Sequence, residues 1–206
     1  MNPLISIWTQ PKETIRYVLE YKTWSYSFFI LLLSAISVGL TSFADTDFIP
    51  DLPLIVLVML AIISTFIGSI ISLFISAALY NWIGKWLGGT GNFSDMFQMT
   101  PIASIPLIWM LPINLLLVVV FGKSIFIGMD ESVAFVSLPA TLLLLSNILT
   151  FGLSIFGFII LSKGIGIVHH FSSWRGFSVL MIIFGFALVI FVPLLILLFF
   201  IVIAAV

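Results

Sequence analysis

The sequence predicts an all-α integral membrane protein, a bundle of five transmembrane helices preceded by a short amphipathic helix. Composition is the first reason: 62% of the 206 residues are hydrophobic and 7% are charged, against about 25% charged residues in an average soluble domain. The second reason is five apolar runs, each longer than the roughly 20 residues that cross a hydrocarbon core. These runs are residues 24–44, 52–82, 101–121, 133–162 and 177–206, which leave 1–23 as an N-terminal segment and 24–206 as the membrane domain.

Charged side chains lie only between these runs. Proton relays, ion-coupled carriers and voltage sensors need ionisable groups at membrane depth, so the sequence argues against those classes. A net charge of −1 argues against a nucleic-acid surface, and Lys and Arg occur singly, without a run that would attract anionic lipid strongly. The many serines have no buried acid and base to activate them. We therefore expect neither catalysis nor a cofactor.

The distribution of charge predicts the orientation in the membrane. With the N-terminus inside, six of the 7 Lys and Arg residues fall on the inner side and Lys123 falls outside. Because Lys and Arg favour the cytoplasmic side, we expect a multi-pass plasma-membrane protein with a cytoplasmic N-terminus and an outer C-terminus. Trp and Tyr prefer the headgroup level, and most of them gather at the inner boundary: Tyr17, Tyr21, Trp24, Tyr26, Tyr80, Trp82, Trp86 and Trp174.

Residues 1–23 predict an amphipathic helix at the inner surface. Pro11 suits the first turn of a helix, and Ile15, Val18 and Leu19 line one face of it. We expect this helix to pack beneath the bundle and to stiffen the first span. An independent membrane-sensing role is the alternative.

Small residues recur every four positions in the second and fourth runs. This spacing lets helix backbones approach closely in lipid, so it predicts two packing seams; a hydrophilic line along a pore is the alternative. The seam residues are Gly68, Ser72, Ser76, Ser146, Thr150 and Ser154.

Three prolines, Pro101, Pro106 and Pro112, fall in the third run. Proline removes a helical hydrogen bond and clashes with the preceding turn, so this run is predicted to kink or break. A broken helix either packs as a bent element or builds a transporter site at the midplane.

The second and fourth runs also share a register. The seam residues of one lie 78 positions before those of the other, and Phe93 lies the same distance before Phe171. This offset suggests that spans two and three repeat as spans four and five, as a parallel repeat about an axis along the membrane normal. The alternative is a coincidence, because small residues are common in membrane helices.

A glycine-rich stretch, Gly88, Gly89 and Gly91, follows the second run. The lysine and hydroxyl of a nucleotide-binding loop do not follow it, so nucleotide binding is not expected. The stretch instead predicts a tight turn that caps the second span, with Asn92 or Ser94 starting a short interfacial helix.

His169 and His170 are weak candidates for a metal site. Neighbouring helix positions do not share a face, so the pair chelates poorly. Asp95 would be a third ligand only if the two inner loops meet. We expect no metal.

Several loosely defined motifs follow one another along nearly the whole chain. They are Asn2, Pro3, Ile7, Trp8, Thr9 and Pro11 at the start, Gly88, Gly89, Gly91, Phe93, Ile105 and Pro106 in the middle, and Phe171, Ser172, Ser173 and Trp174 near the end. In this order they resemble the Ypt-interacting protein (YIP) family in its short bacterial form. The resemblance implies five spans and a cytosolic N-terminus. Eukaryotic members associate with Rab-type GTPases, but this chain lacks their long N-terminal region and their Asp-Leu-Tyr-Gly-Pro motif, so GTPase binding is doubtful.

The resulting hypothesis is a non-catalytic YIP-type protein that binds membrane partners or organises lipid at the cytoplasmic face. Its expected partners are the lipid bilayer and either further copies of itself or other multispanning proteins. A transporter or channel for a neutral or amphipathic small molecule is the alternative. The residues expected to matter, chiefly in loops and packing, are Gly88, Gly89, Gly91, Phe93, Pro106, Phe171 and Trp174.

Overall fold

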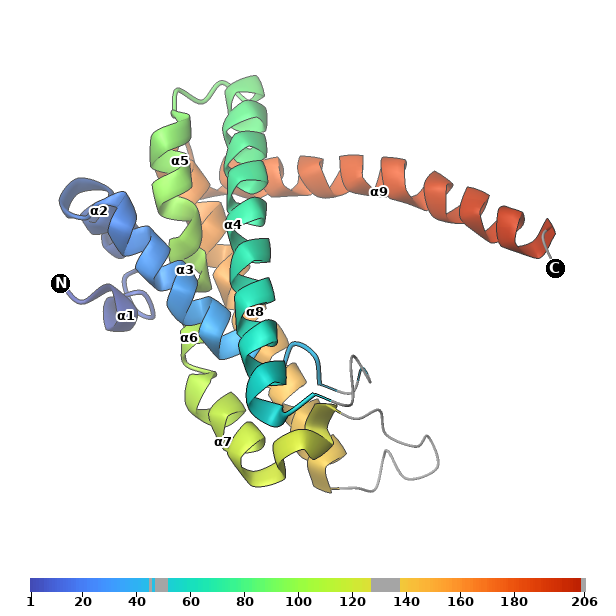
Figure 1. Cartoon of the computed structure of the whole chain (residues 1–206). Coiled ribbons are helices and arrows are strands. Elements are labelled where there is room, and N and C mark those ends of the chain that lie inside the picture. The colour runs from blue at the N-terminus through green and yellow to red at the C-terminus, as the bar shows by residue number, and fades with distance from the viewer. Residues whose placement is uncertain (45, 47–51, 127–137, 205–206) are drawn as a thin grey trace.

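A computed structural model of the chain describes residues 1–44, 46, 52–126 and 138–204 (Figure 1). Within these ranges every regular element is a helix, which confirms the predicted fold class. The elements are α1 (Pro3–Ser6), α2 (Pro11–Tyr21), α3 (Trp24–Gly39), α4 (Leu54–Trp86), α5 (Phe93–Met99), α6 (Ile105–Ile108), α7 (Leu111–Phe121), α8 (Leu138–Val168) and α9 (Ser173–Ala204), with 3₁₀ turns η1 (Thr100–Ser104) and η2 (Gly122–Phe126).

Three described helices are long and apolar enough to cross a membrane: Leu54–Trp86, Ala140–Val168 and Ser173–Phe200. A fourth span results if the bent pair Phe93–Ile108 and Leu111–Phe126 is counted as one. α3 has 16 residues, fewer than the predicted run 24–44, because the chain turns after Gly39. α4 and α8 extend past their apolar runs and include Lys85 and Lys163. Long basic side chains at helix ends can reach the interface.

The third run is broken, as its prolines predict. The two limbs of the pair meet at 51°, with Pro106 in the first turn of α6 and Pro112 in the first turn of α7. A break in lipid leaves backbone groups that need new partners. The Ser37 hydroxyl of α3 donates to the Leu107 carbonyl at 2.7 Å, and the Trp109 indole donates to the Leu4 carbonyl at 3.3 Å. The break is therefore fastened to α3 and α1.

Two hydrophobic cores stabilise the described bundle. The larger one lies at the end that carries the C-termini of α4 and α8 together with α2 and α5, which we call the inner end; Ile15, Phe97 and Ile160 are fully buried in it. The smaller core lies at the opposite end and includes Leu57 and Leu117. The burial of Ile15 and its neighbours confirms that α2 packs against the bundle.

α9 leaves the bundle sideways (Figure 1). Its first turns pack tightly on α8: the Ser162 hydroxyl donates to the Ser173 carbonyl at 2.8 Å, and Gly176 lies against the backbone of Ser162 and Gly166. Further along, large apolar side chains such as Val189 and Phe199 are exposed. A helix that is apolar on all sides belongs in lipid or against a partner.

The two predicted repeat units differ in shape. In the first, α4 is followed by a limb broken into α5, η1, α6 and α7. In the second, α8 is followed by one continuous helix, α9, with Pro193 inside it. The internal repeat therefore remains a prediction from the sequence.

Candidate functional site

The turn after α4 is built by the glycines that the sequence singles out. Gly88 has a positive φ of 82°, a conformation that costs other residues about 1–2 kcal/mol. Its amide donates to the Lys85 carbonyl at 3.0 Å, and the Gly89 amide donates to the Gly84 carbonyl at 2.9 Å. This pair of bonds is a Schellman motif, which satisfies two carbonyls at the helix end.

His169, at the end of α8, is seated in this turn. Its side chain is 1% exposed, and its Nδ1 accepts a hydrogen bond from the Gly91 amide at 3.1 Å. A Cβ added to Gly84, Gly89 or Gly91 would collide with the His169 side chain or the backbone beside it. Glycine is therefore needed at these three positions so that the backbone can approach His169 closely. Together the three glycines form a backbone cradle around the His169 imidazole.

The electrostatics of the cradle favour neutral histidine. Nδ1 already accepts a bond, and Nε2 is buried without a hydrogen-bond partner. Burial lowers the pKa of His169 from its ordinary value of 6.5; Lys85 and His170 act in the same direction, and the Tyr80 backbone carbonyl acts against them. Protonation would turn Nδ1 into a donor facing the Gly91 amide, so it would break this contact.

A second Schellman motif closes α8. The Phe171 amide donates to the Gly166 carbonyl at 2.9 Å, and the His170 amide donates to the Ile167 carbonyl at 3.2 Å. In this second motif His170, with a φ of 56°, occupies the position that Gly88 occupies in the first. The two turns thus correspond at an offset of 82 residues (88 to 170) rather than 78. Phe93 begins α5 whereas Phe171 still belongs to the α8 turn, so these two phenylalanines are not structurally equivalent.

Asn92 is the N-cap of the short helix α5. Its side chain accepts a hydrogen bond from the Asp95 amide at 2.8 Å and donates to the Asp95 carboxylate at 2.8 Å. This confirms Asn92 rather than Ser94 as the start of the helix. Asp95 is thereby engaged in capping.

Gln98 is a residue that sequence reasoning missed. It is buried on α5, and its side-chain amide donates to the carbonyls of Val18 at 3.0 Å and Lys22 at 2.6 Å, at the end of α2. The backbone carbonyl of Gln98 accepts a bond from the Ser27 hydroxyl of α3 at 2.7 Å. One residue therefore joins three helices, and an amide inside an otherwise apolar stretch was the signal available for it.

Aromatic side chains form an exposed rim at the inner end. Trp24, Trp82, Trp86, Trp174 and Tyr21 are all exposed, and Trp174 is 79% exposed. Indole rings suit the headgroup level of a bilayer. By contrast, Phe93 packs on Phe97 and Phe171 stacks on the His169 ring, so both belong to the packing of this end, whereas Pro106 is buried in α6 at the break of the third run.

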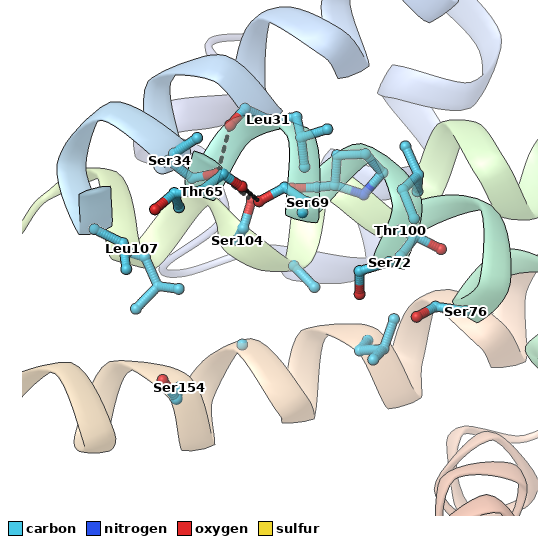
Figure 2. A pocket seen from close by; sticks show the side chains of 18 of the residues that line it. Leu31, Ser34, Thr65, Ser69, Ser72, Ser76, Thr100, Ser104, Leu107 and Ser154 are labelled. Carbon is cyan, nitrogen blue, oxygen red and sulfur yellow. Dashed lines mark hydrogen bonds between the residues drawn. The ribbon is translucent and has the colours of Figure 1, made fainter. Parts of the chain in front are cut away.

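A hydroxyl-lined cleft of about 580 Å³ lies between α4 and α8. Figure 2 shows Ser154 on one side of the cleft and Ser34, Ser104, Ser72 and Ser76 on the other. The Ser34 and Ser104 hydroxyls are 3.2 Å apart and also bond to backbone carbonyls. The Ser72 hydroxyl makes no hydrogen bond to another described residue. The residues lining the cleft include no ionisable side chain among those described.

The seam residues largely face this cleft instead of a packed neighbour. No atom lies within 4 Å of a Cβ added to Gly68, and the Ser154 hydroxyl bonds back to the Thr150 carbonyl at 2.8 Å. The reason is that η1 and α6 pack against both α3 and α8, which leaves α4 and α8 standing apart at this level. Ser146 and Thr150 do not line the cleft, and the Ser146 hydroxyl donates to the side-chain carbonyl of buried Asn114 at 2.9 Å.

The metal candidates are not brought together. No group of three His, Cys, Asp or Glu residues that could hold a metal ion occurs in the part of the chain that the structure describes. His169 is committed to the glycine cradle, Asp95 to the α5 cap, and His170 lines a different cavity.

Comparison with known proteins identifies the family of this chain. No curated protein and no solved structure matches the chain. The family model described as the Yip1 domain matches residues 5–205, which is nearly the whole chain. That family is generally one of non-enzymatic membrane proteins. The order of motifs, the helical membrane bundle and the extent of this match agree, and the chain belongs to the Yip1 domain family.

Proposed function

We propose that this protein is a non-catalytic membrane protein that organises lipid and binds membrane partners at its inner end, which faces the cytoplasm. The observation that carries the proposal is the exposed aromatic rim at that end. Trp24 projects from the start of α3, and Trp82 and Trp86 project from the end of α4; both helices contribute to one buried core. Rigid indoles at one level provide contact area for headgroups or for a partner helix at little cost in conformational entropy.

The arrangement of α2 supports the same function. α2 packs its apolar face on the bundle and leaves Lys12, Glu13 and Arg16 exposed. Near the exit of α2, the Lys22 ammonium lies 5.3 Å from the centre of the Tyr26 ring, within cation–π range. This end therefore combines charge, hydroxyl groups and aromatic surface, as an interfacial layer requires.

Site-specific photocrosslinking in native membranes tests the proposal. A benzoylphenylalanine is placed at Trp24 or Trp82 at the inner end, and at Leu116 or Val119 on α7 as the matched control, since all four positions are exposed. Crosslinks to lipid and to membrane proteins should concentrate at the inner positions. Equal yields at both ends, with the same products, would contradict the proposal.

The cleft favours a second candidate function, the passage or storage of a neutral amphipathic molecule. Its volume lies within the range of about 300–1,000 Å³ of small-molecule sites, and Ser72 offers a free hydroxyl. A photoreactive long-chain alcohol should label the cleft, and Ser72→Trp, which fills it, should abolish the labelling. Ser64→Trp on the exposed side of α4 is the control. Labelling that survives Ser72→Trp would exclude the cleft as the site.

A further inference from the structure

A basic pocket lies where α2, α8 and the start of α9 meet. Its volume is about 510 Å³, and its wall carries Lys12 and Arg16 from α2 and Lys163 from α8. Among the described residues that line it there is no Asp or Glu. The cations come from opposite ends of the sequence and meet because α2 packs along α8. Cations that occur singly in the sequence are therefore brought together at this place.

Hydroxyl groups and an imidazole complete the wall of this pocket. Ser172 and Ser173, at the N-terminus of α9, and His170 line the same cavity. The Ser172 hydroxyl accepts a long bond from the Arg175 amide at 3.4 Å, which leaves its own hydrogen free to donate outward. Cations beside hydroxyl donors bind phosphate oxygens through charge-assisted hydrogen bonds, and the positive end of a long helix adds to this attraction.

His170 gives the pocket a side chain where turn geometry favours glycine. Its φ of 56° lies in the left-handed region, the usual place of glycine in such a motif. The equivalent turn after α4 does carry glycine, Gly88. The side chain of His170 is exposed and lines the basic pocket.

An apolar groove adjoins the basic pocket. This second cavity, of about 370 Å³, shares Lys163 and Ser173 with the first. The rest of its wall is mainly Phe158, Ile159, Trp174 and Phe177, with Phe177 packed edge-on against both Phe158 and Trp174. The basic pocket can hold a phosphate and the groove a hydrocarbon chain. Because the two cavities share walls, one molecule that carries both groups can occupy them together.

The crossing of α8 and α9 holds the two cavities in register. Gly176 of α9 meets the backbone of α8 at Ser162 and Gly166, and the Ser162 hydroxyl bonds to the Ser173 carbonyl at 2.8 Å. Backbones in contact leave little room for sliding. The distance between the cationic wall and the aromatic groove is therefore set by the fold.

From these contacts we infer that this composite cavity is a binding site for one anionic phospholipid, its phosphate among Lys12, Arg16 and Lys163 and one acyl chain in the groove. The inference rests on the proposed function, because it names the class of lipid held at the inner end. Basic pockets beside transmembrane helices are suited to anionic headgroups. A free phosphate would fill only the basic half of the cavity.

Lipid retention measures the site directly. The full chain is reconstituted in nanodiscs with equal amounts of phosphatidylglycerol and phosphatidylcholine that have the same acyl chains, and the lipid retained after extraction is counted by native mass spectrometry. The wild type should retain phosphatidylglycerol with a preference of about tenfold or more, since each cation near a membrane surface is worth about 1 kcal/mol. Lys12→Gln, Arg16→Gln and Lys163→Gln combined should bring the ratio close to one.

The chain offers a control of equal charge. Lys85→Gln, Lys123→Gln and Arg175→Gln remove three cations that do not line the pocket, and this variant should keep the preference. Thermal unfolding of both triple variants checks that they fold. Equal loss in the two variants, or no preference in the wild type, would overturn the site. If crosslinks nonetheless stay at the inner end, the proposed function stands without it.

A substitution in the apolar groove tests whether the groove holds an acyl chain. Phe177→Ala should reduce the retention of phosphatidylglycerol several-fold and leave the binding of glycerol phosphate unchanged, because only the lipid places a chain in the groove. If glycerol phosphate displaces the retained lipid at an equal concentration, the site is one for a free phosphate compound and the assignment to lipid fails.

Discussion

The backbone amide of Gly91 donates a hydrogen bond to Nδ1 of His169 over 3.1 Å, which joins the turn after α4 to the end of α8. A second bond, from the Thr90 amide to the His169 carbonyl at 3.3 Å, runs beside it. Two long helices that stand apart at the level of the cleft are thus tied together at the inner end.

Gly89→Ala should destabilise the protein by about 1–3 kcal/mol, the usual cost of forcing an extra methyl into a packed site. The added Cβ would overlap the His169 ring. The matched control is Gly68→Ala, where no neighbour lies within 4 Å; it should be neutral or gain up to about 1 kcal/mol from helix propensity. Thermal unfolding in detergent measures both, and equal midpoints would contradict the prediction.

Stability should fall as the pH drops below about 6.5, the ordinary pKa of histidine. Burial lowers the pKa of His169 in the folded protein, so between the folded and unfolded pKa values the unfolded chain binds the extra proton. The stability that neutral His169 contributes is complete above the pKa of the histidine in the unfolded chain. It is lost as the pH falls to the pKa of the histidine in the folded protein.

The pH dependence has a direct control. In His169→Asn the amide oxygen can accept from Gly91 without titrating, so this variant should lose the dependence between pH 5 and about 7. His170→Gln, at an exposed position, should retain it. A dependence that persists in His169→Asn would assign it to another group.

His170→Gly should raise stability by roughly 1 kcal/mol, because glycine adopts a left-handed φ without steric cost. The backbone bonds of the turn, from the amides of His170 and Phe171, should persist. An increase in the unfolding midpoint checks the expectation. His170→Ala is the comparison, since it removes the imidazole but keeps the left-handed cost; a rise in both variants alike would refute the backbone explanation.

Gln98→Leu should cost about 1–3 kcal/mol, because the partly buried Lys22 carbonyl at the end of α2 would lose a hydrogen bond. The end of α2 should loosen, and limited digestion with trypsin should cut after Lys22 faster. Gln10→Leu serves as the control, since the Gln10 side chain makes no capping bond. Unchanged cleavage in Gln98→Leu would show that this bond does not hold α2.

Several features of the fold were open to prediction because each depends on local chemistry. Apolar runs without charge require lipid, the prolines of the third run require a break, and Gly88 and Asn92 require a turn and a cap. The structure places a bend at 51° in the third run and confirms both ends of the turn. In these cases a residue and its sequence neighbours are enough to predict the local structure.

Other features depended on which helices meet. The spacing of Ser72 and Ser154 suits close packing, yet α4 packs on α3 while α8 packs on η1 and α6, and the serines line a cleft between α4 and α8. The predicted offset of 78 residues aligns residue types, whereas the two left-handed turn positions, Gly88 and His170, lie 82 residues apart. Spacing alone carries no information about the partner helix.

The sequence by itself determined the environment of this protein, its helical class and its family motifs, because hydropathy and proline act along the chain. Only the tertiary structure decided which distant groups meet. It placed His169 inside a cradle of three glycines, Gln98 at the end of α2, and Lys12 beside Lys163. The physical reason is that a contact between distant residues arises from the packing of whole helices, which no local pattern of residues specifies.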